Sequence, residues 1–497
     1  MPRLQLSKAD AVFFWHNRSF SFPVEYLLYF LTGRCAFADW IFFCNFALNC
    51  ILIFIMARYI KIKRGLDIPR AGIASGRIEI IEPDLVGITP DDFEGHNWKC
   101  CVKEGEELAA GTPLFFDKET ENIKIVSPVS GKVKEIKRGE RRKILYISIV
   151  PDKNSAQLPQ YDIKEEKDKI RKTLQQSGLW AFMRQRPFDI VPDSDAVPRD
   201  IFVTAFDSSP LAQNLFDKDD VPYIEKGLEV LNMLSGKITY IATKANSDVE
   251  FKNGENLKMD GPHPSGNVGV QIASTTPVNK GETVFTLDVT TLIRIGKLYT
   301  DGVPTWKTIV ALTGPEMPDP HLVETVIGID IRQLIPAEIA NDQAIRIISG
   351  NVLTGKKVKV SNEFLRFPYR QITAIAEGGT ADEFMGWASM SPNKFSIKRT
   401  FPAFLKGLSK PFPFDARIKG GKRAMILSGE FDKVFPFDIY PEYLLRAINA
   451  KDIDRMEKLG IYEVAPEDFA LPEFVDTSKQ ELQQMVRDSL NYLRSEL

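Results

Sequence analysis

The stretch from Gly261 to Gly269, which reads GPHPSGNVG, gathers side chains and backbone groups that could bind a ligand. His263 offers a ring N–H and Ser265 a hydroxyl group, while Gly266 and Gly269 let backbone N–H groups approach a bound molecule closely. The two prolines would hold this surface rigid. The stretch could therefore bind a ligand that carries hydrogen-bond acceptors, or it could contact a partner protein. The alternative is a tight structural turn in which His263 is incidental.

The residues around this stretch favour an α/β layer. Residues 238–243 (ITYIAT) and 284–288 (VFTLD) are expected to be strands, and residues 289–299 carry the periodicity of a helix. The density of glycine and proline excludes both helix and strand from residues 261–269. A loop between strands of such a layer lies where α/β folds bind ligands or partners.

The same layer has a Rossmann-like pattern without a phosphate cradle. A strand is expected at 200–205 and a helix at 223–234, which ends at Gly236. The residues after the first strand read FDSSPLAQNLF, and neither GxGxxG nor GxxxxGK[ST] occurs in the chain. The chain is therefore not expected to bind NADH itself.

Composition excludes several other classes of protein. The net charge of −2 over 497 residues leaves no basic excess for nucleic acid. The five cysteines all lie before residue 102 and form no CxxC pair, so iron–sulfur and structural zinc sites are not expected. The four histidines show no metal-ligand spacing. No catalytic residue and no metal ligand is assigned.

Residues 56–150 have the short β-branched segments and glycine or proline turns of an all-β domain. The segment IVSPVSGKVKEI is similar to the barrel-sandwich hybrid of biotinyl and lipoyl carriers. In those carriers a lysine at a hairpin tip receives the cofactor. The matching position here is Thr120, with Lys118 two residues away. The domain therefore resembles the fold without its carrier function.

Residues 1–55 differ from the rest of the chain. Residues 40–56 form a nearly continuous apolar run, at the short end of the lengths that span a bilayer. This segment could be a transmembrane anchor or a signal peptide, although no small-residue cleavage site follows. The interpretation we favour is that the natural chain starts at Met56 and that the preceding residues come from the start-site assignment. If the run does span a membrane, the basic residues after it put the next domain on the cytoplasmic side.

The sequence thus predicts an α/β and β multidomain protein. Its expected parts are an N-terminal extension (1–55), a barrel-sandwich-hybrid domain (56–150), a helical bridge (151–199), a Rossmann-like α/β domain (200–304), a β-grasp, SLBB-like domain (305–378), a loop-rich region (379–440) and a C-terminal helical domain (441–497).

Six segments together carry a family resemblance that covers nearly everything after Met56. They are YIKIKRGLDIPRAG, SPVSGKV, GPHPSGNVG, DVTTLIRIGKLYTDG, RIISGNVLTGKK and GKRAMILSGEFDKVFPFDIYP. Each is weak alone, but in this order they resemble the A-subunit family of the sodium-translocating NADH:quinone oxidoreductase.

The resemblance implies a peripheral subunit on the cytoplasmic side of the bacterial inner membrane, in a complex of six subunits. The complex passes electrons from NADH to a quinone and exports sodium. Flavins, iron–sulfur centres and NADH belong to other subunits, and this chain is expected to carry no cofactor. Its partners would be the other subunits, above all the membrane-embedded B subunit, with quinone as a possible substrate.

On this resemblance, His263, Ser265, Gly266 and Gly269 are candidates to face the quinone or a neighbouring subunit. Two alternatives stay open: a purely structural docking subunit of the same complex, and the C subunit of the Rnf electron-transport complex. The Rnf family carries cysteine clusters where this chain reads PEDFALPEFVDTSK, with Pro472 and Asp476 at positions that are cysteines in many A subunits. This departure speaks against the Rnf alternative.

Overall fold

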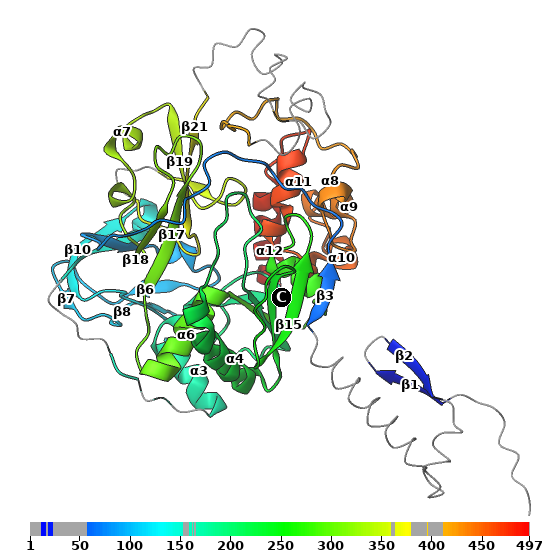
Figure 1. The fold of residues 1–497 in the computed structure, drawn as a ribbon, viewed down its shortest axis with the longest axis horizontal. Helices are drawn as coiled ribbons and strands as arrows, with labels where there is room; N and C mark the ends of the chain where they lie inside the picture. The colour runs from blue at the N-terminus through cyan, green and yellow to red at the C-terminus, as the bar shows by residue number, and fades with distance from the viewer. Residues whose placement is uncertain are drawn as a thin grey trace, which may run out of the picture. The chain divides into compact units, whose positions relative to one another are not determined.

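The computed structural model describes residues 11–15, 18–22, 57–152, 159–161, 163, 166–358, 363–378, 395 and 411–496, in two compact units, Met1–Ala57 and Arg58–Leu497 (Figure 1). In the first unit β1 (Ala11–Trp15) and β2 (Arg18–Phe22) form an antiparallel hairpin. The apolar run predicted at 40–56 lies outside the described residues. Among the described residues, no helix combines the length and apolar character needed to cross a membrane.

Two small antiparallel sheets form the barrel-sandwich hybrid, as predicted. One has the order β5-β11-β10-β7 and the other the order β6-β8-β9. Their strands are β5 (Val86–Ile88), β6 (Trp98–Cys100), β7 (Glu107–Leu108), β8 (Pro113–Asp117), β9 (Lys124–Val126), β10 (Gly131–Arg138) and β11 (Ile144–Pro151). Thr120 lies in the turn between β8 and β9, where its hydroxyl donates to Asp117 Oδ2 at 3.0 Å.

The α/β domain is a six-stranded sheet in the order β12-β16-β13-β14-β15-β3, parallel except for β12. Four of these strands, β13 to β16, follow one another in the chain, yet β16 lies beside β13 and not beside β15. The direction of winding therefore reverses between β13 and β16. In open α/β sheets such a switch point opens a crevice at the carboxyl ends of the strands. The elements are α3 (Lys167–Gln176), β12 (Arg184–Arg186), β13 (Asp200–Thr204), α4 (Val221–Ser235), β14 (Thr239–Lys244), β15 (Gly254–Asp260), α5 (Val268–Ala273), β16 (Val284–Asp288) and α6 (Val289–Asp301).

The prediction for the residues before the glycine-rich stretch was incomplete. The strand that leads directly into the stretch is β15, which the sequence pattern did not indicate. The stretch is also shorter than predicted, because α5 begins at Val268 and includes Gly269.

The two faces of this sheet are covered by different parts of the chain. Ile201 and Val203 on β13 share a core with α4 and α6, whereas Phe202 between them packs with the C-terminal helices. Alternate residues of a strand point to opposite faces, so the C-terminal helices form a third layer on the α/β domain. These helices are α8 (Phe431–Val434), α9 (Pro441–Asn449), α10 (Ile453–Lys458), α11 (Ala470–Val475) and α12 (Leu482–Glu496).

The predicted β-grasp domain is a second six-stranded sheet, in the order β20-β19-β21-β17-β18-β4, with its own apolar core. Its elements are β17 (Lys307–Thr313), β18 (Leu322–Val326), α7 (Ala337–Ala340), β19 (Ile345–Ser349), β20 (Lys356–Lys357) and β21 (Gln371–Ala376).

Residues 58–80 join two of the sheets at their edges. Strand β3 (Arg58–Lys61) pairs in parallel with β15 at the edge of the α/β sheet. Strand β4 (Ile78–Ile80) pairs in parallel with β18 at the edge of the β-grasp sheet. The first residues of the predicted barrel-sandwich domain (56–150) thus add edge strands to the α/β sheet and the β-grasp sheet. The barrel-sandwich sheets begin only at β5.

Candidate functional site

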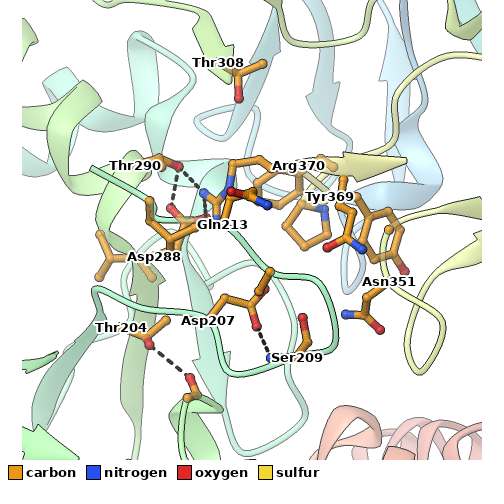
Figure 2. Close-up of a pocket in the computed structure, with 18 of the residues that line it drawn as sticks. Thr204, Asp207, Ser209, Gln213, Asp288, Thr290, Thr308, Asn351, Tyr369 and Arg370 are labelled. Carbon is orange, nitrogen blue, oxygen red and sulfur yellow. Dashed lines mark hydrogen bonds and ion pairs between the residues drawn. The ribbon is translucent and has the colours of Figure 1, made fainter. Parts of the chain in front are cut away.

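A cleft of about 1000 Å³ opens at the switch point of the α/β sheet. Its walls come from four parts of the second unit: the barrel-sandwich hybrid, the carboxyl ends of β13 and β16, the β-grasp domain and the C-terminal helices. Figure 2 shows polar side chains around it, with Thr204 and Asp207 near the end of β13, Asp288 and Thr290 at the end of β16, and Tyr369 and Arg370 from the β-grasp domain. The cleft is therefore at the place where α/β folds bind ligands.

Asp288 is the central acid of the switch point. It caps α6, with Oδ1 accepting from the Thr291 N–H at 2.7 Å, and Oδ2 accepts from Arg370 Nη1 at 2.7 Å. Arg370 also donates to Thr290, as Figure 2 shows. Burial alone would raise the pKa of Asp288, but the charges of Arg370 and Arg294 outweigh it and lower the pKa to about 2. Asp288 is therefore ionised at all physiological pH values.

His263 lines the cleft, but most of its surface is buried within the chain. It is 4% exposed, its Nδ1 lies 2.9 Å from Ser208 Oγ, and its backbone N–H donates to Asp67 Oδ1 at 2.9 Å. Burial lowers the pKa of His263, against the opposing charges of Asp207 and Asp67. The imidazole is therefore neutral at pH 7, and no hydrogen bond to its Nε2 is found in the described part of the chain.

The other three candidate residues of the stretch have separate roles. Ser265 is 1% exposed, and its hydroxyl donates back to Gly261 O at 3.1 Å. Gly266 lines the cleft, and its N–H donates to Ser208 Oγ at 2.8 Å. Gly269 packs against the C-terminal segment, where a Cβ would come within 2.6 Å of Asp468. The structure thus brings His263 and Gly266 to the cleft, while Ser265 and Gly269 hold the loop in place.

One wall of the cleft is a charge network, centred on the buried Arg186, that joins β12 to the C-terminal segment. Arg186 is 3% exposed, and its guanidinium lies 2.8 Å from Glu467 Oε1, 3.5 Å from Asp468 Oδ2 and 3.8 Å from Asp189 Oδ1. Arg487 on α12 reaches Asp189 Oδ2 at 2.9 Å. These ionic contacts link parts of the chain that lie far apart in sequence.

Asp468 is expected to make this protein less stable as the pH rises. Burial raises its pKa to about 6, although Arg186 opposes the shift. The folded state therefore keeps a proton on Asp468 that the unfolded state loses near pH 4. The resulting contribution to the free energy of unfolding is complete below about pH 4 and is lost as the pH rises through about 6. We expect Asp468→Asn to reduce the fall in urea-unfolding free energy between about pH 5 and about pH 7.5, while Glu467, whose pKa burial raises to about 7, still contributes to it. Asp454→Asn, at an exposed position of α10, should keep the wild-type slope.

The sequence did not mark Asp288, Arg370, Arg294 and Arg186 as site residues. The available signal was the position of Asp288 at the end of a predicted strand and the start of a predicted helix, where α/β folds place functional side chains. No local pattern marks the arginines, because their partners come from distant parts of the chain.

A barrel-sandwich hybrid, a three-layered α/β domain and a β-grasp domain around one polar cleft define a multidomain α/β and β protein. Its parts match three family descriptions: the NqrA N-terminal barrel-sandwich hybrid domain (residues 60–152), the NqrA second α/β domain (165–304) and the NqrA C-terminal domain (309–360).

Full-length relatives agree with these matches. Proteins named as the A subunit of the Na(+)-translocating NADH-quinone reductase in Neisseria gonorrhoeae, Hahella chejuensis and Actinobacillus succinogenes are 35%, 36% and 35% identical to this chain. Each alignment covers 88% of this chain and 100% of the relative. The chain belongs to the NqrA family.

Proposed function

We propose that this chain is the peripheral A subunit of a sodium-translocating NADH-quinone reductase and contributes there to quinone reduction coupled to sodium export. The observation that carries the proposal is the extent of the similarity, because relatives with this name are matched over 100% of their length at 35% and 36% identity. The family descriptions cover the barrel-sandwich hybrid, the α/β domain and most of the β-grasp domain, while the C-terminal helices that also line the cleft lie beyond the matched residues.

In this proposal the chain carries no redox cofactor of its own. The flavins, the iron–sulfur centres and the NADH-binding site belong to other subunits. Three features of the sequence support this: the chain has no CxxC pair, Thr120 stands where carriers have a lysine, and the strand at 200–204 is followed by no glycine-rich turn.

The proposed position is the cytoplasmic side of the inner membrane, at the quinone end of the complex and beside the B subunit. The support is the resemblance of the six sequence segments to the A-subunit family. Within the chain, the surface proposed to act is the cleft, where His263 presents a neutral imidazole.

A structural docking role is the second candidate, and one observation favours it. Ser265 and the Gly266 N–H are hydrogen-bonded inside the chain, to Gly261 and Ser208. Groups that already have internal partners are not free to recognise a ligand, so in this alternative Ser265 and Gly266 serve to hold the loop in position.

The test is to purify the complex through a tag on this chain and compare the wild type with His263→Ala and His263→Asn. We expect the wild-type chain to bring down a sodium-dependent NADH-quinone reductase. Both variants should lower quinone reduction while NADH oxidation by an artificial acceptor at the flavin end stays normal. The asparagine can keep the contact with Ser208 but lacks a group at the position of Nε2.

Each result has a distinct meaning. A tagged chain that purifies without reductase subunits would contradict the proposed function. If the complexes assemble fully and both variants keep wild-type quinone turnover, His263 has no part in quinone reduction and the docking role is favoured. Loss in the alanine variant alone would assign the effect to the contact with Ser208 and not to the cleft.

A further inference from the structure

We propose that the switch-point end of the cleft binds an oxyanion, the carboxylate or phosphate group of a small ligand, and that Arg294 is its principal partner. This inference concerns a binding site on the chain itself and does not depend on the proposed role in quinone reduction.

Arg294 is a buried cation without a hydrogen-bonding partner among the described residues. It lies on α6, is 4% exposed, and lines both the cleft and a smaller cavity of about 40 Å³ beside it. Within the described part of the chain no hydrogen bond to its guanidinium is found, and its Nε is fully enclosed. The ring centre of Phe182 lies 5.5 Å from the guanidinium carbon. A ring face compensates only part of the cost of burying a charge.

The carboxylates near Arg294 already have other arginines. Asp288 binds Arg370 at 2.7 Å, and Asp92, on the wall of the smaller cavity, binds Arg366 at 2.5 Å. At the switch point two arginines therefore face one carboxylate, which leaves one surplus positive charge. Burial lowers the pKa of Arg294 to about 10, so the group stays charged at neutral pH.

Asp207 also lines the cleft, but its charge acts elsewhere. It affects the pKa of His263 and that of Glu467. The charges that shift the pKa of Arg294 are those of Asp288 and Arg370. Asp207 therefore does not cancel the surplus positive charge at Arg294, and of the described acids that line the cleft only Asp288 shifts the pKa of this arginine.

Further hydrogen-bond donors without partners in the described part of the chain line the same cleft as Arg294. Ser209 Oγ, Gln213 Nε2 and Arg370 Nε are enclosed, have no hydrogen-bond partner among the described residues, and belong to side chains that line the cleft. Figure 2 shows these three side chains around one cavity. Buried donors without acceptors are costly, and a ligand rich in acceptor oxygens would satisfy them.

The chemical class of the ligand follows from these two features. The donors require acceptor oxygens, and the unpaired guanidinium requires negative charge. Carboxylate and phosphate groups provide both, and their planar or tetrahedral oxygens match the fork of a guanidinium. An uncharged ligand would satisfy the donors but would leave the charge unpaired.

The experiment uses the full chain with two probes, orthophosphate and acetate, each compared with chloride at equal ionic strength. Binding is measured by calorimetry and by the rise in the unfolding temperature. We expect at least one oxyanion to raise the unfolding temperature above that in chloride. Phosphate alone would indicate a phosphate ester as the natural ligand, acetate alone a carboxylate, and both results support the site.

The decisive variant is Arg294→Met, which keeps an apolar side chain against Phe182 and removes the charge. We expect it to lose at least about tenfold in oxyanion affinity, the effect of losing charge-assisted hydrogen bonds. Without ligand it should be as stable as the wild type or more stable, because an unpaired buried charge has been removed. Arg77→Met, at an exposed arginine paired with Asp319, is the matched control and should bind like the wild type.

Four results would overturn the inference. They are no stabilisation by either oxyanion beyond chloride, unchanged affinity in Arg294→Met, stabilisation by an uncharged quinone analogue but by neither oxyanion, and strong destabilisation of the ligand-free variant. The last would show that the guanidinium has a partner in the folded chain. Reductase activity of the assembled complex is measured separately, so its loss or retention does not bear on these results.

Discussion

Replacing Arg186 with methionine is expected to lower the free energy of unfolding at about pH 7.5 by about 3–5 kcal/mol. The guanidinium is 3% exposed and stands among three carboxylates, of which Asp468 has a fully buried side chain. Removing the cation leaves these acids without their central partner in a poorly solvated place. Methionine is flexible and has a similar volume, so little of the loss would come from a cavity.

The measurement is urea unfolding of the full chain, with Arg77→Met as the control. Arg77 also contacts a carboxylate, Asp319 at 2.6 Å, but both side chains are more than half exposed. Exposed ion pairs contribute about 0–1 kcal/mol, so the control should change little. An Arg186→Met variant as stable as the control would mean that the network adds nothing to the docking of the C-terminal segment.

Replacing Gly296 with alanine is expected to destabilise the protein by about 3 kcal/mol, at the upper end for overpacking. Gly296 lies on α6 where it crosses α4, and a Cβ there would be 1.9 Å from the carbonyl oxygen of Tyr223. The obstacle is backbone of a neighbouring helix and not a flexible side chain. The two helices must therefore move apart, and the core beneath them must open.

The check is the unfolding temperature of Gly296→Ala beside that of Gly421→Ala. Gly421 has open space around it, so its alanine variant should unfold like the wild type. If Gly296→Ala also unfolds like the wild type, then α4 and α6 do not require this close approach. The prediction matters for the site, because α6 also carries Arg294 and is capped by Asp288.

Much of the fold could be predicted from local patterns. The strand at 284–288 and the helix after it were expected at nearly the residues that β16 and α6 occupy. Gly236 ends α4 in a left-handed conformation, as its position after an apolar periodic segment indicates. These features depend on neighbours in sequence, and a single chain displays them directly.

Strand β15 shows why one central element was missed. Its sequence, GENLKMD, looks too polar for an inner strand. Lys258 is only 8% exposed, yet its ammonium group leaves the apolar layer and donates to the carbonyl oxygens of Ser247 and Val249 at 2.7 and 2.8 Å. A lysine that finds its acceptors on a loop has no signature within its own segment.

The candidate site was only partly predictable for a similar reason. The glycine-rich stretch was recognised from its composition, and it does reach the cleft through His263 and Gly266. The charge of the cleft depends instead on contacts between distant residues: Arg370 meets Asp288 across 82 positions, and Arg186 meets Glu467 across 281. Such pairs arise from the arrangement of the sheets, which no spacing along the chain reveals.

The pairings of β3 and β4 affect the order in which the sheets can form while the chain is being synthesised. Tyr59 on β3 bonds to Asp260, 201 residues later, and Arg77 next to β4 bonds to Asp319, 242 residues later. At about 5–20 residues per second of synthesis, the first of these segments waits about 10–40 s on the ribosome before its partner strand exists. Strand β3, the earliest described strand of the second unit, is thus among the last to pair. In each molecule the edges of two sheets are completed by residues that were synthesised well before their partners.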